Sequence, residues 1–248
     1  MHNVNIENII SIAKEAGKIA MSFYDKPYSI AEKKNKTPIT EVDQALHDYL
    51  MKELSVYGYP ILSEEGEDDF EKRKNAEFVW IIDPLDGTSD FIQKTGEFAV
   101  MIGLVNNGGE SILGVVYAPA LDELYFAQKG EGAYMMKDGE KTKLTVSDRE
   151  LEKGRILVSR NHLGEFEQEI AKKHHMQQIS MGSAGLKMCR IAKRDAELYI
   201  NSSDQSGVWD ICAGDVIIKE AGGRIVDLNK DIILYDKQVI LKSGCIVL

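Results

Sequence analysis

Two aspartates three residues apart, Asp83 and Asp86, are the residues of this sequence best suited to chemistry. They stand in the segment Ile81–Thr88, where a short apolar run meets a proline and then a glycine. Because Pro84 cannot continue a hydrogen-bonded strand, we predict a tight turn in which both carboxylates and the Leu85 carbonyl converge on one point. Hard oxygen ligands of this kind suit Mg²⁺. The segment therefore predicts a magnesium site.

Gly87 and Thr88, which follow the two carboxylates, are suited to binding a phosphate. A glycine lets the backbone approach a ligand closely, and the N–H groups of both residues could open a helix whose N-terminus receives an anion. Metal and phosphate would then meet at one place. The alternative is purely structural, because Asp, Pro and Gly each favour turns independently of any ligand.

Three further acids stand where predicted elements begin or end. Glu64 follows the apolar stretch Tyr59–Ile61, Asp210 opens an apolar helix, and Asp43 comes three residues after Thr40. Each has a structural alternative: Glu64 as a solvated loop residue, Asp210 as an acid favoured by the helix dipole, and Asp43 as the partner of Thr40 in a capping box.

Hydrophobic periodicity predicts the elements of the first half of the chain. Apolar residues at helical spacing predict helices over Ile6–Tyr24 and Thr40–Leu54, and the apolar run Phe78–Ile82 predicts a buried strand. Turn residues then separate a series of apolar runs that predicts an antiparallel meander. These runs are Phe98–Val105, Ile112–Tyr117, Glu123–Ala127 and Ala133–Met136.

From Arg155 onward, short strands and helices alternate, which is typical of an α/β lobe. The predicted elements are strand Arg155–Ser159, helix Gly164–Lys173, strand Gln177–Met181, helix Ala184–Ala192, strand Ala196–Ile200, helix Trp209–Ala221 and strand Arg224–Val226. A charged stretch near Asp148–Glu150 separates the two regimes. We therefore predict an N-terminal α+β lobe over 1–150 that carries the meander and metal site, and a C-terminal α/β lobe over 151–248 that completes the site and substrate pocket.

Composition and charge exclude several classes of function. A formal net charge of −10 argues against binding a nucleic-acid polymer, so an anionic substrate would need bound metal ions. We find neither a signal peptide nor an apolar run long enough for stable membrane insertion, and we expect a cytoplasmic enzyme. The scattered Cys189, Cys212 and Cys245 predict buried free thiols, and His174-His175 predicts a solvated surface pair. No oligomeric state follows from the sequence.

Several separated motifs together resemble the signature of the inositol monophosphatase superfamily. They are Asp83-Pro84-Leu85-Asp86-Gly87-Thr88, Glu64 upstream of it, Trp209-Asp210-x-x-Ala213-Gly214, and Ala221-Gly222-Gly223. The resemblance spans nearly the whole chain. It implies an α/β fold layered as αβαβα, of the inositol monophosphatase and fructose-1,6-bisphosphatase type. It also implies a lithium-sensitive phosphomonoesterase that uses two or three Mg²⁺ ions.

The resemblance also implies roles for individual residues. Glu64, Asp83, Asp86, Asp210 and the Leu85 carbonyl would hold the metals. Asp43 and Thr88 would orient the attacking water, with Glu64 counted among the catalytic residues. One Mg²⁺ can activate water while another stabilises the leaving oxygen, so no covalent intermediate is needed.

Local segments are most similar to the family's 3′(2′),5′-bisphosphate nucleotidases: Leu62–Glu65, Val158–His162 and Gly182–Lys187. They imply a substrate site of Arg160, His162, Ser183 and Lys187, joined by Gly87, Thr88 and Asp210. The expected reaction removes the 3′-phosphate from adenosine 3′,5′-bisphosphate, giving AMP and phosphate.

Alternatives remain open for the substrate site and the function. Lys187 taken alone is also typical of a helix surface. Ser89-Asp90-Phe91 stands where many bacterial nucleotidases have Lys-Glu-Phe, and Tyr199–Asn201 lacks an arginine often found near the base pocket. Alternative functions are inositol monophosphate or fructose bisphosphate hydrolysis, and a non-catalytic sensor that binds a phosphorylated ligand through metal.

Overall fold

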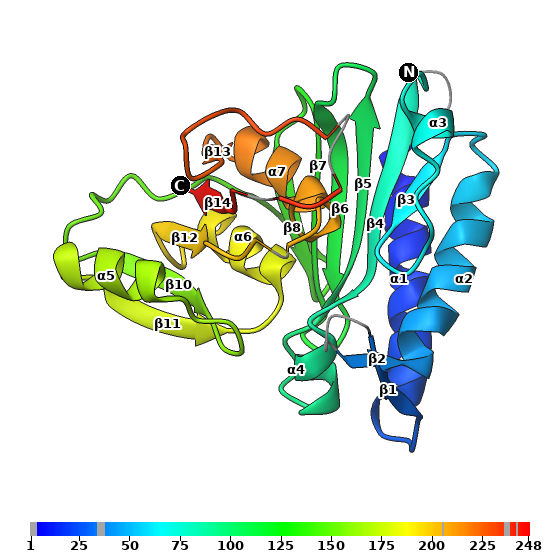
Figure 1. Ribbon diagram of the computed structural model, residues 1–248, viewed down its shortest axis with the longest axis horizontal. Coiled ribbons are helices and arrows are strands. Elements are labelled where there is room, and N and C mark those ends of the chain that lie inside the picture. The colour runs from blue at the N-terminus through cyan, green and yellow to red at the C-terminus, as the bar shows by residue number, and fades with distance from the viewer. Residues whose placement is uncertain (1–3, 34–37, 205, 236–238, 242) are drawn as a thin grey trace.

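Two β-sheets and three layers of helices alternate through the molecule (Figure 1). The computed structural model describes residues 4–33, 38–204, 206–235, 239–241 and 243–248. Its helices are α1 (Ile6–Tyr24), α2 (Glu41–Ser55), α3 (Phe70–Arg73), α4 (Thr88–Ile92), α5 (Glu165–Lys173), α6 (Ala184–Ala192) and α7 (Trp209–Glu220).

The larger sheet has the order β3-β4-β5-β6-β7-β8-β9 and is antiparallel except for the parallel pair β3 and β4. Its strands are β3 (Ile61–Ser63), β4 (Phe78–Asp86), β5 (Ala99–Asn106), β6 (Ser111–Ala118), β7 (Glu123–Gln128), β8 (Ala133–Lys137) and β9 (Glu140–Lys143). This confirms the predicted meander.

The smaller sheet has the order β11-β10-β12-β14-β13, with β14 antiparallel to both of its neighbours. Its strands are β10 (Arg155–Ser159), β11 (Gln177–Met181), β12 (Leu198–Asn201), β13 (Ile225–Val226) and β14 (Cys245–Val247). A separate two-stranded ribbon pairs β1 (Ile30–Glu32) with β2 (Pro38–Thr40). Hydrophobic periodicity did not predict β1, β2, β9 or β14. These strands are only three or four residues long, which is too short to show a clear alternation.

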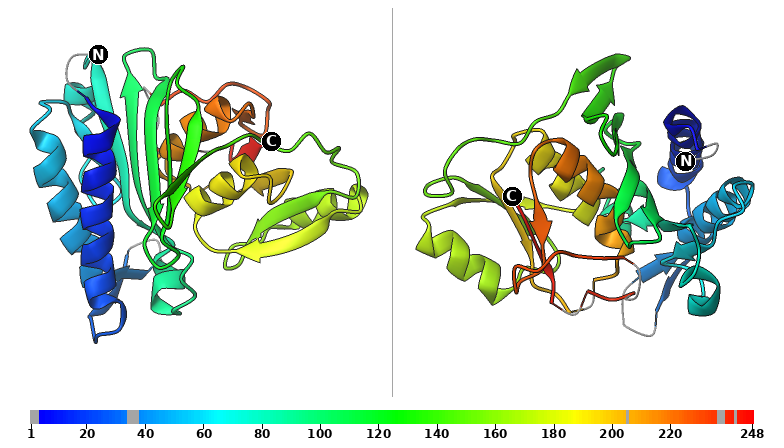
Figure 2. Two further views of the ribbon diagram at one scale, coloured as in Figure 1. Left: turned by 180° about the vertical axis from the view of Figure 1, so that it is seen from behind. Right: turned by 90° about the horizontal axis from the view of Figure 1, so that it is seen from above.

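Side chains alternate across the large sheet and bury both of its faces. In β4, Trp80 and Ile82 join the core under α1 and α2, while Val79 and Ile81 join the core shared with α6 and α7. Figure 2 shows α6 and α7 between the two sheets, with α5 on the outer face of the smaller one. The order is therefore αβαβα, as the sequence led us to expect. The division of the chain at 150/151 stays a prediction, and the core around α7 includes residues from both sides of it.

Strand β4 corrects one expectation, because it runs through Pro84 instead of ending there. Asp83 pairs with Met101 and Asp86 with Ala99, so three residue steps in β4 lie opposite two in β5. This is a β-bulge, the place in a sheet where a residue without an N–H is tolerated. The extra residue shifts the alternation by one, which brings Asp86 onto the same face as Asp83. That face is the one covered by α6 and α7.

Other features of the chain follow the predictions. All three cysteines are buried and free. His175 is exposed and His174 half-buried at the end of α5, beside Glu152. Over the ranges that the structure describes, no helix combines the length and apolar character that crossing a bilayer requires.

Helix α7 packs so closely on the large sheet that glycine is required beneath it. A Cβ atom on Gly114 would overlap the Ala213 carbonyl oxygen, and one on Gly103 would lie 2.6 Å from the Cys212 sulfur. Backbone atoms cannot move aside as a flexible side chain can. Because α7 carries Asp210, this contact sets the distance between that acid and the sheet.

We expect Gly114→Ala to destabilise the fold, because overpacking a tight core costs about 1–3 kcal/mol. For a chain of this size, each kcal/mol lowers Tm by roughly 2–4 °C. Thermal unfolding followed by circular dichroism measures the change. Gly108→Ala is the matched control, since its Cβ would meet only the Asn106 side chain at 3.3 Å. Equal Tm values for the two variants would contradict the proposed close contact.

Candidate active site

Three carboxylates meet between the large sheet and the helices that cover it. Oxygens of Asp83, Asp86 and Asp210 all lie within 4.8 Å of one another. Asp83 and Asp86 come from the bulged end of β4 and are 1% and 6% exposed, while Asp210 opens α7 and is half-buried. The bulge therefore gathers Asp83 and Asp86 on one side, and α7 supplies Asp210, so three of the four acids predicted to hold metal come together.

Burial and mutual repulsion raise the pKa values of these acids. Burial, followed by the charges of Glu64 and the neighbouring aspartates, holds the pKa of Asp83 well above its usual range. Burial and the charges of Glu64 and Asp86 do the same to the pKa of Asp210. Ionising carboxylates in such surroundings is costly unless a cation is present. This donor set, made of hard oxygen atoms, fits divalent magnesium.

The start of α6 holds the Asp86 carboxylate. Its oxygens accept hydrogen bonds from the backbone N–H groups of Ala184 (3.0 Å) and Gly185 (2.7 Å), and also from the Ser183 hydroxyl. Burial raises the pKa of Asp86, whereas these bonds and the nearby charge of Lys187 oppose the rise. Ser183, predicted as a substrate contact, thus also orients a carboxylate of the cluster.

Glu64 lies at the end of β3, where its backbone N–H donates to the Ile82 carbonyl across the parallel pair. Its carboxylate contacts Lys33 at 2.8 Å, and the same ammonium group reaches Glu65. Glu64 also lines the cavity described below and contributes to the raised pKa of Asp83. It is therefore a paired residue at the edge of the acidic cluster and not simply a solvated loop acid.

Asp43 performs its capping role and a second one at the same time. Its Oδ2 atom accepts from the backbone N–H of Thr40 at 2.7 Å, which completes the capping box of α2. Its Oδ1 atom accepts from the Thr88 hydroxyl at 3.0 Å. Thr88 also lies 3.2 Å from the Leu85 carbonyl oxygen. The two predicted water-orienting residues are therefore in direct contact, beside the bulge that carries Asp83 and Asp86.

Gly87 begins α4 with a φ of 93°, a left-handed conformation that favours glycine. A Cβ atom there would lie 2.9 Å from the Glu97 carbonyl oxygen. Both observations account for a glycine at this position without any ligand. They also show how the chain turns sharply between Asp86 and Thr88.

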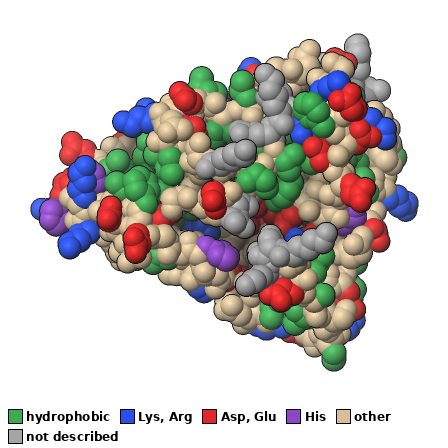
Figure 3. Space-filling view, viewed as in Figure 1, with side chains coloured by type: hydrophobic (Ala, Val, Ile, Leu, Met, Phe, Trp, Pro, Cys, Tyr) green, Lys and Arg blue, Asp and Glu red, His purple; other side chains and the backbone are tan. Residues whose placement is uncertain are grey.

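The carboxylates open into a cavity of about 630 Å³. On the face shown in Figure 3, acidic side chains lie at the bottom of a hollow near the centre of the molecule. The cavity is lined at its acidic end by Glu64, Asp83, Leu85, Asp86, Gly87, Thr88 and Asp210. Farther along, its walls include Ser159, Asn161, His162, Glu167, Tyr199, Asn201, Ser203 and Ile240.

Arg160, which the resemblance places in the substrate site, forms ion pairs with the protein's own acids. Its guanidinium binds Asp90 and Glu97, and Arg160 is not among the described residues that line the cavity. Its neighbours Asn161 and His162 do line it. The Ser-Arg-Asn-His segment therefore reaches the cavity through Ser159, Asn161 and His162, of which His162 was predicted as a substrate contact.

Lys187 is buried, at 3% exposure, so the alternative of a helix-surface lysine is wrong. Its ammonium donates to the carbonyl oxygens of Ser183 (2.9 Å), Gly182 (3.3 Å) and Met181 (3.4 Å). Burial lowers the pKa of Lys187, and the charges of the surrounding acids oppose the fall. Lys187 thus places a positive charge at the cavity wall while its donors face the backbone.

Sequence reasoning missed several residues at this site. Asp90 and Glu167 are buried acids that line the cavity, and Glu97 binds Arg160 from outside it. One Glu167 oxygen accepts from the Ser202 N–H at 2.8 Å. The apolar neighbour Phe91 was the one available signal for burial of Asp90. No feature of the sequence distinguishes the buried Glu167 from the other acids of α5.

Comparison with known proteins identifies the class of protein that this fold and site define. Residues 3–247 match the Inositol monophosphatase family. The chain therefore belongs to that family, which confirms the resemblance and the layered fold. Members of the family generally depend on Mg²⁺ and act on small phosphorylated substrates, and the acidic cluster of this chain could bind metal.

Individual relatives within the family are similar to this chain over most of its length. The 3′(2′),5′-bisphosphate nucleotidase CysQ of Aggregatibacter actinomycetemcomitans is 34% identical over 238 residues, which cover 94% of this chain and 88% of that protein. The crystal structure of CysQ from Bacteroides thetaiotaomicron has a TM-score of 0.84 and 32% identity, covering 98% of this chain and 96% of that one. The IMPase TM1415 of Thermotoga maritima has a TM-score of 0.81 and 27% identity, covering 97% and 90%.

Asp83→Asn should stabilise the metal-free protein while weakening its response to Mg²⁺. A carboxyl whose pKa is raised in the folded state makes folding less favourable as pH rises from its unfolded pKa through its folded pKa. At pH 8 with a chelator, removing that charge should raise Tm by about 2–4 °C, the shift that roughly 1 kcal/mol produces in a chain of this length. At pH 4 the gain should shrink.

The matched control is Asp48→Asn, which changes an exposed aspartate of α2. Scanning calorimetry with chelator and with Mg²⁺ compares the variants, because a ligand that binds only the folded state raises Tm. An Mg²⁺-induced rise in Asp83→Asn as large as that of the unaltered protein would exclude Asp83 as a ligand.

Proposed function

We propose that the protein is a Mg²⁺-dependent phosphatase that removes the 3′-phosphate from adenosine 3′,5′-bisphosphate, giving AMP and phosphate. The observation that carries the proposal is the contact between Thr88 and Asp43 beside three clustered carboxylates. A water-orienting pair next to a metal-binding set has the parts needed for hydrolysis by an activated water. The names of the relatives support the nucleotide as substrate.

Glu64, Asp83, Asp86, Asp210 and the Leu85 carbonyl are the groups that would hold two or three Mg²⁺ ions, and we expect Li⁺ to inhibit. Bound Mg²⁺ supplies the charge that lowers the pKa of water and stabilises the leaving oxygen. The chain contributes fixed ligand positions, since backbone N–H groups orient the side chains of Asp83, Asp86 and Asp210.

Thr88 and Asp43 would orient the attacking water and receive its proton. The Thr88 hydroxyl donates to Asp43, which leaves the lone pairs of that hydroxyl to accept a hydrogen bond from a water molecule. Burial raises the pKa of Asp43, although bonds from Thr40 and Thr88 oppose the rise. A raised pKa makes the carboxylate a better proton acceptor. Asp43 therefore acts as a base through Thr88.

Substrate recognition would use the part of the cavity beyond the carboxylates. Gly87, Thr88, Ser183 and Asp210 would contact the reacting phosphate, and His162, which lines the same cavity, would contact the rest of the substrate. Lys187 would act on the second phosphate mainly through its charge, because its donors bind carbonyl groups. The similarity to an IMPase structure favours inositol monophosphate as a second candidate substrate.

A phosphate-release assay across adenosine 3′,5′-bisphosphate, inositol monophosphate and fructose 1,6-bisphosphate with Mg²⁺ tests the proposed substrate. We expect kcat/KM for the nucleotide to exceed the other two values by about 10²-fold or more, the discrimination that buried polar contacts can provide. The chelated protein serves as the blank. A higher kcat/KM for inositol monophosphate would reverse the ranking, and no turnover of any ester would favour a sensor.

Thr88→Val should lower kcat by about 10²-fold, the usual contribution of a proton-transfer group. Valine retains the shape of threonine but loses the hydroxyl that joins Asp43 to the site. Thr88→Ser is the matched control, because it keeps the hydroxyl and should keep most of the activity. Steady-state kinetics at saturating Mg²⁺ separate the two variants. The proposed water-orienting role fails if valine and serine reduce kcat equally.

A further inference from the structure

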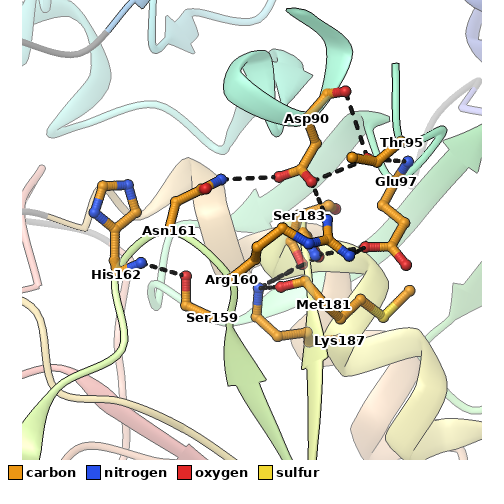
Figure 4. Close-up of polar contacts among 11 residues, drawn as sticks. Asp90, Thr95, Glu97, Ser159, Arg160, Asn161, His162, Met181, Ser183 and Lys187 are labelled. Atoms are coloured by element: carbon orange, nitrogen blue, oxygen red, sulfur yellow. Dashed lines mark hydrogen bonds and ion pairs between the residues drawn. The ribbon is translucent and has the colours of Figure 1, made fainter. Parts of the chain in front are cut away.

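A cluster of ion pairs around Arg160 adjoins the cavity through Asp90 (Figure 4). One terminal nitrogen of Arg160 binds Asp90 Oδ1, and the other binds Glu97 Oε2 at 2.6 Å. The guanidinium thus lies between two carboxylates with both terminal nitrogens occupied. Planar, two-pronged contacts of this kind fix the orientation of an arginine more firmly than a single point charge would.

Asp90 connects this cluster to the cavity. It is 2% exposed, and its carboxylate also accepts from the Thr95 hydroxyl at 3.0 Å and from the Asn161 amide at 3.2 Å. A Cβ atom on Gly182 would overlap the Asp90 carboxyl group, so the β11–α6 turn packs directly against it. A buried acid with this many partners cannot shift without breaking several contacts.

Glu97 ties a third segment to the same arginine. Its Oε2 atom accepts from the Gly182 N–H at 2.8 Å as well as from Arg160. The cluster therefore joins α4 and the loop after it to the ends of β10 and β11. These segments belong to the two different sheets or flank them. The cluster therefore links the segment after Asp86 to the Ser159–His162 segment, and both segments line the cavity.

We propose that Arg160 is a positioning residue, which clamps the Ser159–His162 segment to Asp90 and Glu97 so that Asn161 and His162 face the bound nucleotide. This inference rests on the proposed function. It replaces the direct substrate contact that the resemblance implied for Arg160. The segment leaves β10 just beyond Ser159. Within the segment, the His162 N–H donates a hydrogen bond to the Ser159 hydroxyl.

Charge also favours a positioning role. A guanidinium that already binds two carboxylates has its charge offset locally, so an incoming phosphate would gain little attraction from it. Breaking either pair to reach the substrate would leave a buried or half-buried carboxylate without its partner, which is costly. Arg160 therefore acts on the substrate through its neighbours.

Hydrogen exchange on the metal-free protein tests the clamp without relying on activity. Arg160→Lys keeps the charge but loses the two-pronged geometry, so amides 160–163 should exchange faster than in the unaltered protein. Arg155→Lys is the matched control, because Arg155 stands at the other end of β10 and pairs with the buried Glu197. Equal exchange at 160–163 in both variants would overturn the proposal.

Kinetics then separate positioning from direct contact. For Arg160→Lys we expect KM for adenosine 3′,5′-bisphosphate to rise by about tenfold, the scale of effect that a misplaced binding segment produces. The kcat/KM for p-nitrophenyl phosphate, which has neither a nucleoside nor a second phosphate, should stay within about twofold. An unchanged KM for the nucleotide, or equal losses on both substrates, would contradict the clamp.

Glu97→Gln supplies the decisive second variant. A clamp predicts that KM rises in this variant also, and that Arg160→Lys combined with Glu97→Gln is no worse than the larger single effect. Direct contact predicts the opposite, because releasing Arg160 from Glu97 would lower KM. If the unaltered protein does not hydrolyse the nucleotide, the proposed function fails, and hydrogen exchange alone decides the clamp.

Discussion

The repulsion among three carboxylates held within 4.8 Å of one another is the constraint on which the rest of this structure depends. Isolated buried charges of one sign are unfavourable, so each acid must be held in place by other contacts. Backbone N–H groups of Leu85 in β4, Ala184 and Gly185 in α6, and Gly207 before α7 supply those contacts. A divalent cation bound among these acids would offset the repulsion and restore the lost stability.

The architecture can be understood as the arrangement that brings these donors together. A bulge around Pro84 turns Asp86 to the face of Asp83, and the glycines of β5 and β6 let α7 approach that face closely. Helix α6 then directs its first N–H groups at Asp86. Layering helices between two sheets is therefore more than a way to bury apolar surface, because it sets the positions of the site's ligands.

Cations near the cavity mainly neutralise the protein's own acids. Lys33 binds Glu64 and Glu65, Arg160 binds Asp90 and Glu97, and Lys187 lies among several carboxylates. A chain of net charge −10 whose nearby cations are already paired with acids has little positive charge left to attract an anionic substrate. In the proposed function, the attraction for phosphate would come largely from metal bound at the acidic cluster, while the side chains would provide position.

The sequence by itself determined the chemistry, because the Asp83–Thr88 motif, Glu64 and Asp210 require only residue type and order to indicate metal and phosphate. It also determined the main helices and the meander, since their periodicity is local. Only the tertiary structure decided that β4 continues through Pro84, that Asp43 reaches Thr88, and that Arg160 turns from the cavity to Asp90 and Glu97. These outcomes depend on contacts between residues 13 to 70 positions apart, and no local pattern carries the geometry that selects one partner over another.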